Sequence, residues 1–205
     1  MLGTPTTFAI GIGAIGFGGF FAMYSYIAPL ATEVTGLDAS LVPLVLVAIG
    51  LGMTVGNLVG GRLADWSVRR TMLLAFLALA ASLALLGVAA RHPAGLFAGA
   101  FLVGATAAAL SPTIQTRLMD VARDSQSIAA ALNHSALNIG NSLGALLGGF
   151  VIAAGFGYLA PIWVGLALTA AGIALAFASF AVDRARARRG AAVPWLTGAV
   201  EAVDG

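Results

Sequence analysis

The sequence predicts an all-α, polytopic membrane protein with six transmembrane helices, and three observations support this fold class. Hydrophobic residues make up 60% of the chain and charged residues only 9%, whereas a soluble domain carries roughly a quarter charged residues. Six apolar runs fill almost the whole chain, each near the length of about 20 residues that spans a bilayer. The connections between the runs alternate between Arg-rich and Arg-poor.

Taken in chain order, the runs predict six helices. The first run contains no acidic or basic residue before Glu33 and lacks the basic start of a signal peptide, so we expect a retained span. The later runs are separated by short segments that carry charges or glycines. The expected helices are Thr7–Ala31, Leu41–Gly61, Thr71–Ala90, Ala94–Thr116, Ser127–Ala154 and Tyr158–Val182.

The Arg residues predict how the chain is oriented in the membrane. Nine lie in one set of connections and the tail, and one lies in the other set, beside acidic residues. Because cytoplasmic loops carry the excess of Lys and Arg, both termini are expected in the cytoplasm, at a plasma (inner) membrane. Residues 1–182 would form the helical bundle, and residues 183–205 a basic, then small and polar, disordered cytoplasmic tail. The nine are Arg62, Arg69, Arg70, Arg117, Arg123, Arg184, Arg186, Arg188 and Arg189, and the tenth is Arg91.

Composition excludes several classes of function. The chain has no Cys and only two His residues, so neither a metal site nor another cofactor site is expected. A pI near 9.7 does not indicate a nucleic-acid partner, because the Arg residues lie in short loops and the tail rather than in a basic groove. The partner expected from the apolar surface is the lipid bilayer.

Two glycine stripes, on the expected second and fifth helices, predict close helix packing. Each repeats at four-residue spacing and removes side chains from one helix face, so that another backbone can approach. Each also carries a Gly-Asn pair, and the two pairs lie about three helices apart in the sequence. A three-plus-three inverted repeat has this form, and chance is the alternative, because Gly accounts for 27 of 205 residues. The stripes are Gly52, Gly56 and Gly60, and Gly140, Gly144 and Gly148.

The charged segment 61–70 connects the second and third runs. Gly61 would permit a tight exit from one helix, and Asp65 would lie just before the next, where the positive end of the helix dipole stabilises a carboxylate. Arg69 and Arg70 would anchor the cytoplasmic face. Without regard to spacing, an ordinary basic loop that only sets topology explains the same residues.

The spacing in this segment resembles the signature loop of the major facilitator superfamily, Gly-x-Leu-Ala-Asp-basic-x-Gly-basic-basic. Trp66 stands where that family usually has a basic residue, and Val68 where it usually has glycine. The resemblance implies that Asp65 is the central partner of a latch for one state of an alternating-access cycle, weakened here by the two departures. The matching residues are Gly61, Leu63, Ala64, Asp65, Arg69 and Arg70.

Segment 129–144 on the fifth helix resembles the penultimate helix of drug and sugar efflux permeases of the proton-antiporter branch. Over residues 7–182 the chain resembles the C-terminal six helices of such a twelve-helix transporter, which are half of a major facilitator fold. The resemblance implies a small-molecule substrate, efflux by alternating access, and a second six-helix half that completes the cavity. That half could be the N-terminal part of a longer polypeptide, a separate chain or a second copy of this one.

Polar residues within the expected spans are candidates for a substrate pathway. At about 100° per residue, His134, Asn138 and Asn141 fall within an arc of roughly 60° beside the glycine stripe, and polar side chains in a span usually face protein or a water-filled cavity. Tyr24, in an aromatic cluster, and Gln115, near a helix proline, are further candidates. The alternatives are interhelical hydrogen bonds for the amides, a passive histidine, an aromatic belt and an ordinary proline kink.

Titratable groups are scarce in the expected spans, which bears on the mechanism. No Asp, Glu or Arg lies in the middle of a span, so His134 is the only candidate there for proton coupling. A coupling carboxylate is therefore expected in the other half, as the resemblance also implies. An enzyme is not expected, because Ser142 of the Gly-x-Ser-x-Gly pattern lies within a helix, about 12 Å along it from His134. The alternative to transport is a non-transporting membrane fragment or a regulatory or assembly membrane protein.

Overall fold

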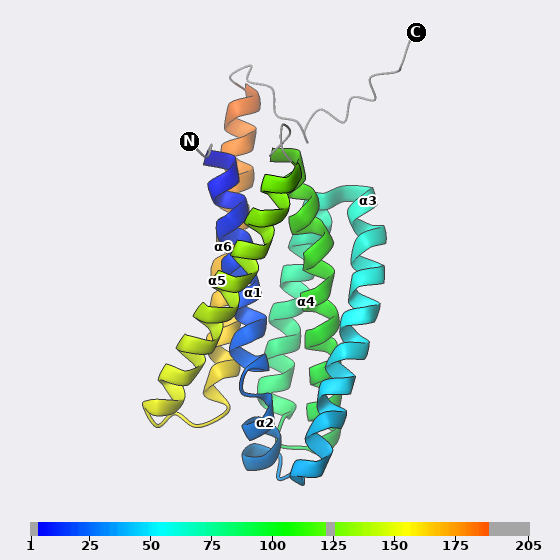
Figure 1. Cartoon of the computed structure of the whole chain (residues 1–205), viewed down its shortest axis with the longest axis vertical. Coiled ribbons are helices and arrows are strands. Elements are labelled where there is room, and N and C mark those ends of the chain that lie inside the picture. Colours follow the sequence, from blue (N-terminus) through cyan, green and yellow to red (C-terminus); the bar gives the residue numbers. More distant parts are fainter. Residues whose placement is uncertain (1–3, 122–125, 189–205) are drawn as a thin grey trace.

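The computed structural model describes residues 4–121 and 126–188, and every regular element in these two ranges is helical. The long helices run side by side along the long axis of the molecule (Figure 1), and α1 contacts α4, α5 and α6. The elements are α1 (Thr4–Tyr24), α2 (Ile27–Pro29), a π-helical turn η1 (Leu30–Val34), a 3-10 turn η2 (Ala39–Leu41), α3 (Val42–Ala89), α4 (Pro93–Val121), α5 (Gln126–Ala153) and α6 (Ala160–Arg188).

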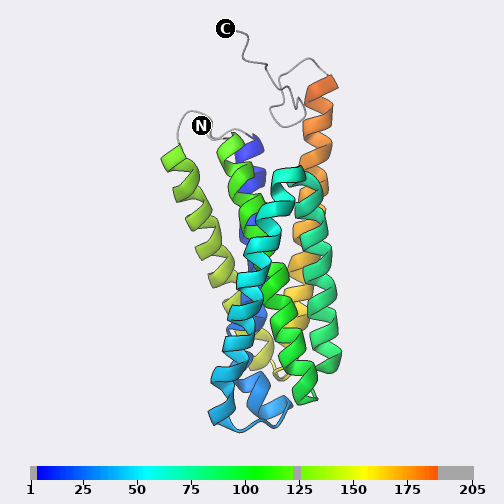
Figure 2. The same cartoon turned by 90° about the vertical axis from the view of Figure 1, so that its right-hand side faces the viewer.

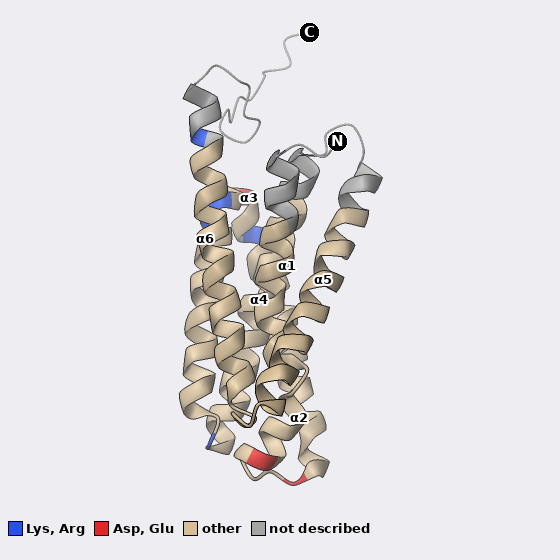
Figure 3. Ribbon diagram, turned by 90° about the vertical axis from the view of Figure 1, so that its left-hand side faces the viewer, with Lys and Arg blue, Asp and Glu red and all other residues tan. Residues whose placement is uncertain are grey.

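Length and hydropathy identify four helices in the described part that can cross a membrane, and a fifth if the bent pair that begins with α1 is one span. Figure 3 shows that the acidic and basic residues of the described part lie toward the two ends of the bundle, and that the ribbon between them carries none. This distribution fits a bilayer, whose hydrocarbon core excludes unpaired charges. The chain is therefore an all-helical, multi-pass membrane protein.

The first span is broken where a single helix over Thr7–Ala31 was predicted. Helix α1 ends at Tyr24, and the segment from Ile27 to Val34 continues at an angle of 43°. Pro29 explains the position of the break, because a proline lacks the backbone N–H and its ring clashes with the carbonyl four residues earlier, here at Ser25. The prediction of one straight helix was wrong at this point.

The predicted loop between the second and third spans is almost entirely helical. Helix α3 runs through it and departs from helical geometry within the helix only at Ser67, with φ −167° and ψ 101°. The chain reverses at this point, so that a first arm (residues 42–66) and a second arm (residues 68–89) run in opposite directions (Figures 1 and 2). Leu, Ala and Arg are good helix formers, which explains why helix continues through the charged segment.

The remaining helices begin close to their predicted positions. Helix α4 starts at Pro93, a residue suited to the first helical position because its missing N–H is not needed there. Helix α5 begins and ends within one residue of the prediction. Helix α6 continues to Arg188, so residues 183–188, which were predicted to belong to a disordered tail, are helical. Residues 189–205 of that tail lie outside the described ranges, as do residues 122–125.

A fully buried aromatic ring holds three helices together. Phe76, on the second arm of α3, is completely buried. A Cβ at Gly16 of α1 would lie 2.6 Å from its ring, and one at Gly172 of α6 would lie 2.9 Å from it. The ring thus occupies space that side chains at the two glycines would need.

The glycine stripe of the first arm lies against the backbone of α4. A Cβ at Gly60 would lie 2.6 Å from the Cα and carbonyl oxygen of Ala109, and a Cβ at Gly56 would meet the carbonyl group of Ala105. Gly52 meets the same helix one turn earlier. We call this contact the α3–α4 seam.

The glycine stripe of α5 makes the corresponding contact with α1. A Cβ at Gly140 would lie 2.5 Å from a backbone oxygen of α1, and one at Gly144 would lie 2.7 Å from the backbone nitrogen of Ala22. The ring of Tyr26 covers the third glycine, Gly148, at 2.7 Å from its would-be Cβ. The Tyr26 hydroxyl donates a 2.6 Å hydrogen bond to the carbonyl oxygen of Ala145, which ties the end of α1 to α5.

Candidate functional site

Four helices line a hollow of about 200 Å³ in the part of the bundle on one side of the α3–α4 seam, and it is open on one side. Three phenylalanines of α1 form one wall, and α3, α4 and α5 supply the others. The lining contains no charged residue, and its two hydrogen-bonding side chains are Asn57 and Ser111. We call this the aromatic hollow, and it is lined by Phe17, Phe20, Phe21, Met53, Asn57, Ala107, Ala108, Ser111 and Leu137.

The two polar side chains of the aromatic hollow are available to a ligand. Among the described residues, neither Asn57 nor Ser111 makes a side-chain hydrogen bond. Asn57 is exposed and Ser111 is partly buried. A small site with an aromatic wall and a few polar groups is suited to an uncharged or amphipathic organic molecule, because apolar area supplies affinity and the polar groups fix orientation.

Tyr24 extends the aromatic wall beyond the hollow. Its ring stacks on Phe20 with centroids 5.2 Å apart and an interplanar angle of 21°, and meets the edge of Phe21 at 6.4 Å. Tyr24 is 38% exposed, so it lies between the hollow and the surface. Of the predicted pathway residues, it has the most direct link to the hollow.

The other predicted pathway residues do not line the hollow. His134, Asn138 and Asn141 are all exposed on α5, while the glycine stripe of the same helix is buried against α1. Gln115 is exposed on α4, and Thr113, two residues earlier, is buried. Thr113 donates its hydroxyl to the carbonyl of Leu110 at 2.7 Å, within its own helix.

Sequence reasoning did not assign Asn57 to the hollow, although it singled out the residue as half of a Gly-Asn pair. The signal was the glycine stripe itself. At about 100° per residue, Met53 and Asn57 lie one step around the helix from Gly52 and Gly56. Once the stripe contacts α4, these two residues must border the contact on one side.

The charged segment is held in place by hydrogen bonds around Ser67. The Ser67 hydroxyl accepts the Arg70 N–H at 3.4 Å, the geometry of an N-cap on the second arm. The Thr71 hydroxyl donates a 2.6 Å bond to the carbonyl of Leu63 across the break. Ser67 therefore lies at the start of the second arm, the position just before the helix where Asp65 was predicted. Gly61 lies within the first arm with open space around it, so the exit it was expected to permit is not at that residue.

Two neighbouring residues of this segment face outward. Asp65 is exposed and makes no hydrogen bond or ion pair with any described residue, and Trp66 is 90% exposed. Arg69, by contrast, places its guanidinium 4.7 Å above the ring of Phe180 on α6, a cation–π contact. Arg69 is thus fixed to α6 of its own bundle, while Asp65 and Trp66 are free to contact another molecule or another part of the protein.

Apolar spanning helices around a small hollow with few polar groups are an arrangement found in membrane proteins of the transport class. Sequence comparison identifies the family. The chain matches the model of the Major Facilitator Superfamily over residues 9–198, and it belongs to this family of transporters.

Three relatives are similar over most of the chain. The inner membrane transport protein YdhP of Escherichia coli (strain K12) is 37% identical over 159 residues, which are 75% of this chain and 41% of that protein. A chloramphenicol resistance protein of Streptomyces lividans is 30% identical over 81% of the chain and 42% of its own length. A probable sugar efflux transporter of Helicobacter pylori (strain ATCC 700392 / 26695) is 30% identical over 74% and 39%. The chain thus spans about two fifths of the length of these relatives.

Proposed function

We propose that this chain is one six-helix half of a transporter that exports small molecules by alternating access. The observation that carries the proposal is the aromatic hollow, in which Asn57 and Ser111 keep free hydrogen-bonding groups beside an aromatic wall. A second half packed over this side would enclose the hollow near the middle of the membrane, and rocking of the halves would open it to either side. The substrate class is uncharged or amphipathic organic molecules, in keeping with the names of the efflux relatives.

The six helices of the proposal are α1 with its bent continuation, the two arms of α3, α4, α5 and α6. Their contacts support a three-plus-three inverted repeat. The second helix of the first set places its glycines on α4, and the second helix of the other set, α5, places its glycines on α1. An exchange of the two sets converts one contact into the other, as a twofold relation requires.

Both termini would lie in the cytoplasm. The support is the Arg distribution, since the break at Ser67 and the end of α6 are basic while the turns between α2 and α3 carry Glu33 and Asp38. In this orientation the charged segment is cytoplasmic. Asp65, with Arg69 and Arg70, would form the latch against the second half, and the exposure of Asp65 supports a partner outside this bundle.

The exposed polar face of α5 would border the pathway once the second half is present. Asn138 and Asn141 would contact substrate or water there, with Tyr24 at one end of the aromatic wall, and His134 and Gln115 nearer the basic end. Among the described residues, no acidic residue lies in the middle of α1, of either arm of α3, or of α4, α5 or α6, so a proton-coupling carboxylate would belong to the second half.

The test begins with the mass of the complex that contains this chain, purified from its native membrane under mild conditions. Two halves, in one polypeptide or in two, are expected. The complex is then reconstituted in liposomes, and uptake of radiolabelled chloramphenicol is measured. Asn57→Leu should lower transport roughly tenfold, because a lost hydrogen bond in a buried site costs about 1–3 kcal/mol.

The matched control is Ser142→Ala, an exposed position on α5 outside the hollow. This variant should leave transport unchanged. If it instead abolished transport completely, Ser142 would be a candidate nucleophile and an enzymatic role would have to be tested. A chain that purifies alone and moves no probe would contradict the proposal and favour a non-transporting fragment or a regulatory or assembly protein.

A further inference from the structure

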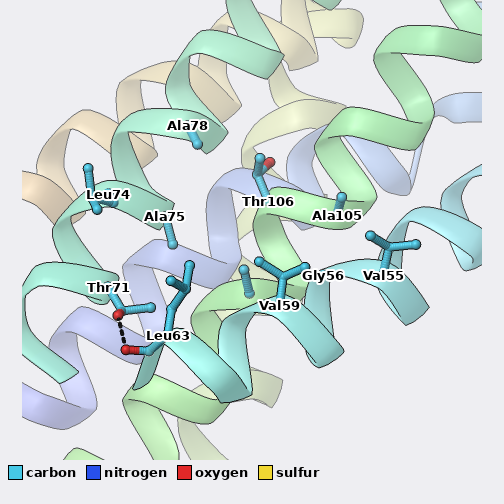
Figure 4. A pocket seen from close by; sticks show the side chains of 11 residues that line it. Val55, Gly56, Val59, Leu63, Thr71, Leu74, Ala75, Ala78, Ala105 and Thr106 are labelled. Atoms are coloured by element: carbon cyan, nitrogen blue, oxygen red, sulfur yellow. Dashed lines mark hydrogen bonds between the residues drawn. The ribbon is translucent and has the colours of Figure 1, made fainter. Parts of the chain in front are cut away.

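A second hollow, of about 250 Å³, lies on the other side of the α3–α4 seam. The two arms of α3 and the middle of α4 line it, and Figure 4 shows their side chains converging on it. Val59 and Leu63 come from the first arm, and Leu74 and Ala78 from the second. We call it the lateral hollow. It shares no lining residue with the aromatic hollow.

The lateral hollow offers a ligand no free hydrogen-bonding side chain. Its two hydroxyls are both used within the protein, since Thr71 donates to Leu63 at 2.6 Å and Thr106 donates to Leu102 at 2.8 Å. The other lining side chains are aliphatic, and Gly56 has none. A water molecule needs two to four polar partners in a cavity, so this hollow favours an apolar occupant.

The surface around the lateral hollow faces hydrocarbon. Along the second arm every exposed side chain after Leu74 is apolar, and the large ones are Leu77, which is 55% exposed, Leu85, 47%, and Val88, 68%. No charged residue lies between Arg70 and Arg91. In the membrane such a face contacts acyl chains. A lipid is therefore the apolar molecule that has direct access to the lateral hollow.

One end of the lateral hollow is basic. Arg62 directly precedes the lining residue Leu63, and its guanidinium lies 3.4 Å from the carbonyl of Leu58, back along the arm toward the hollow. Arg70 directly precedes the lining residue Thr71 and is exposed. Asp65 follows Arg62 by three residues, which places the two on neighbouring parts of the helix surface, but Asp65 makes no ion pair with any described residue.

We propose that the lateral hollow binds an anionic phospholipid, with part of one acyl chain between the arms of α3 and the phosphate at Arg62 and Arg70. Guanidinium groups bind phosphate oxygens through charge-assisted hydrogen bonds, and each basic residue near an anionic headgroup strengthens binding. The lipid fills the space between the two arms, next to the segment proposed to act as the latch. Binding or release of the lipid would therefore change the position of the second arm relative to the first.

The experiment measures lipid retained by the purified complex in native mass spectra. The protein is freed of lipid in detergent, and phosphatidylglycerol or phosphatidylcholine with identical chains is added. Phosphatidylglycerol should bind and phosphatidylcholine should bind at least fivefold less. Arg62→Gln should weaken phosphatidylglycerol binding roughly fivefold, the effect of one basic residue at a membrane surface. Arg184→Gln, an exposed Arg on α6, is the matched control and should change nothing.

A second pair of variants tests the acyl chain. Ala78→Phe fills the lateral hollow and should abolish retention of phosphatidylglycerol, whereas Ala81→Phe, at an exposed position of the same arm outside the lining, should not. A phosphatidylglycerol with a photoreactive chain should crosslink to residues 55–63 and 71–78 of the unmodified protein. Equal binding of the two lipids, equal effects of the two Arg variants, or crosslinks confined to other helices would each overturn the proposal.

Discussion

The two hollows that flank the α3–α4 seam are close in size but opposite in chemistry. The aromatic hollow keeps Asn57 and Ser111 free of protein partners, while the lateral hollow has its hydroxyls bonded within the chain. One glycine stripe creates both, because it brings two backbones together and leaves the side chains on either side to border separate spaces. The difference teaches that unsatisfied polar groups, rather than the volume of a hollow, separate the proposed pathway for solutes from the proposed site for lipid.

The largest effect should come from opening the seam. Gly56→Leu would drive a side chain into the backbone of Ala105, and we expect a loss of more than about 3 kcal/mol in the free energy of unfolding, above the usual range for overpacking. Denaturant unfolding in detergent measures it. Gly50→Leu is the control, since nothing lies within 4 Å of a Cβ there. Equal stability of the two variants would show that the seam is not a close contact.

A polar group added to the lateral hollow should destabilise the protein more than the removal of a polar group from the aromatic hollow. Val59→Asn would put an amide where the structure offers no partner, and we expect a loss of about 1–2 kcal/mol in stability. Asn57→Leu, which removes an amide from the aromatic hollow, should cost less. Both are compared by thermal unfolding in the same detergent, and the reverse order would contradict the assignment of the lateral hollow to lipid.

The hydrogen bond across the break should contribute a smaller amount. Thr71→Val removes the donor to Leu63, and we expect a loss of about 0.6 kcal/mol, the average for such bonds in membrane bundles. Thr54→Val removes a hydroxyl that is bonded only within its own helix turn, to Gly50 at 3.0 Å. That variant should be neutral. Proteolysis near residue 67 provides a second measurement, since only Thr71→Val should make the break more accessible.

The smallest effect lies outside the spans and provides a reference away from both hollows. Hydrogen bonds from Ser40, first from its side chain and then from its backbone, lower the pKa of Asp38 below its ordinary value of 3.8. A lowered pKa in the folded state means that the stabilisation is present above about pH 4 and is lost as the pH falls through the folded-state pKa. Asp38→Asn should therefore flatten the loss of stability below pH 4, measured by thermal unfolding.

The positions of the helices could be predicted well from the sequence, and the breaks could not. Length and apolar composition locate spans because both depend on the bilayer. The break at Ser25, by contrast, depends on Pro29 four residues later. The continuation of the first arm of α3 through Asp65, as far as the break at Ser67, depends on local helix propensity. Side chains with charges were taken to indicate a loop, although at the membrane surface a charged helix is equally well solvated.

The glycine stripes show how far a site could be predicted. Spacing alone indicated that Gly56 and Gly140 allow a close approach, but it did not say which helix approaches. The walls of the aromatic hollow depend on which helix approaches, because α1 and α4 supply two of them. Asn57 therefore became a candidate only when its helix was seen against α4, whereas Asn138 and Asn141 are exposed and no described residue covers them.

The single-residue break at Ser67 has a consequence for how the folded protein sits in a bilayer. With one non-helical residue between them, the two arms of α3 have no slack that would let them lie at independent depths. A shift of one arm along the membrane normal must move the other by the same distance. The two arms therefore set a single depth in the membrane, and a change in that depth alters which residues of both arms lie in the hydrocarbon.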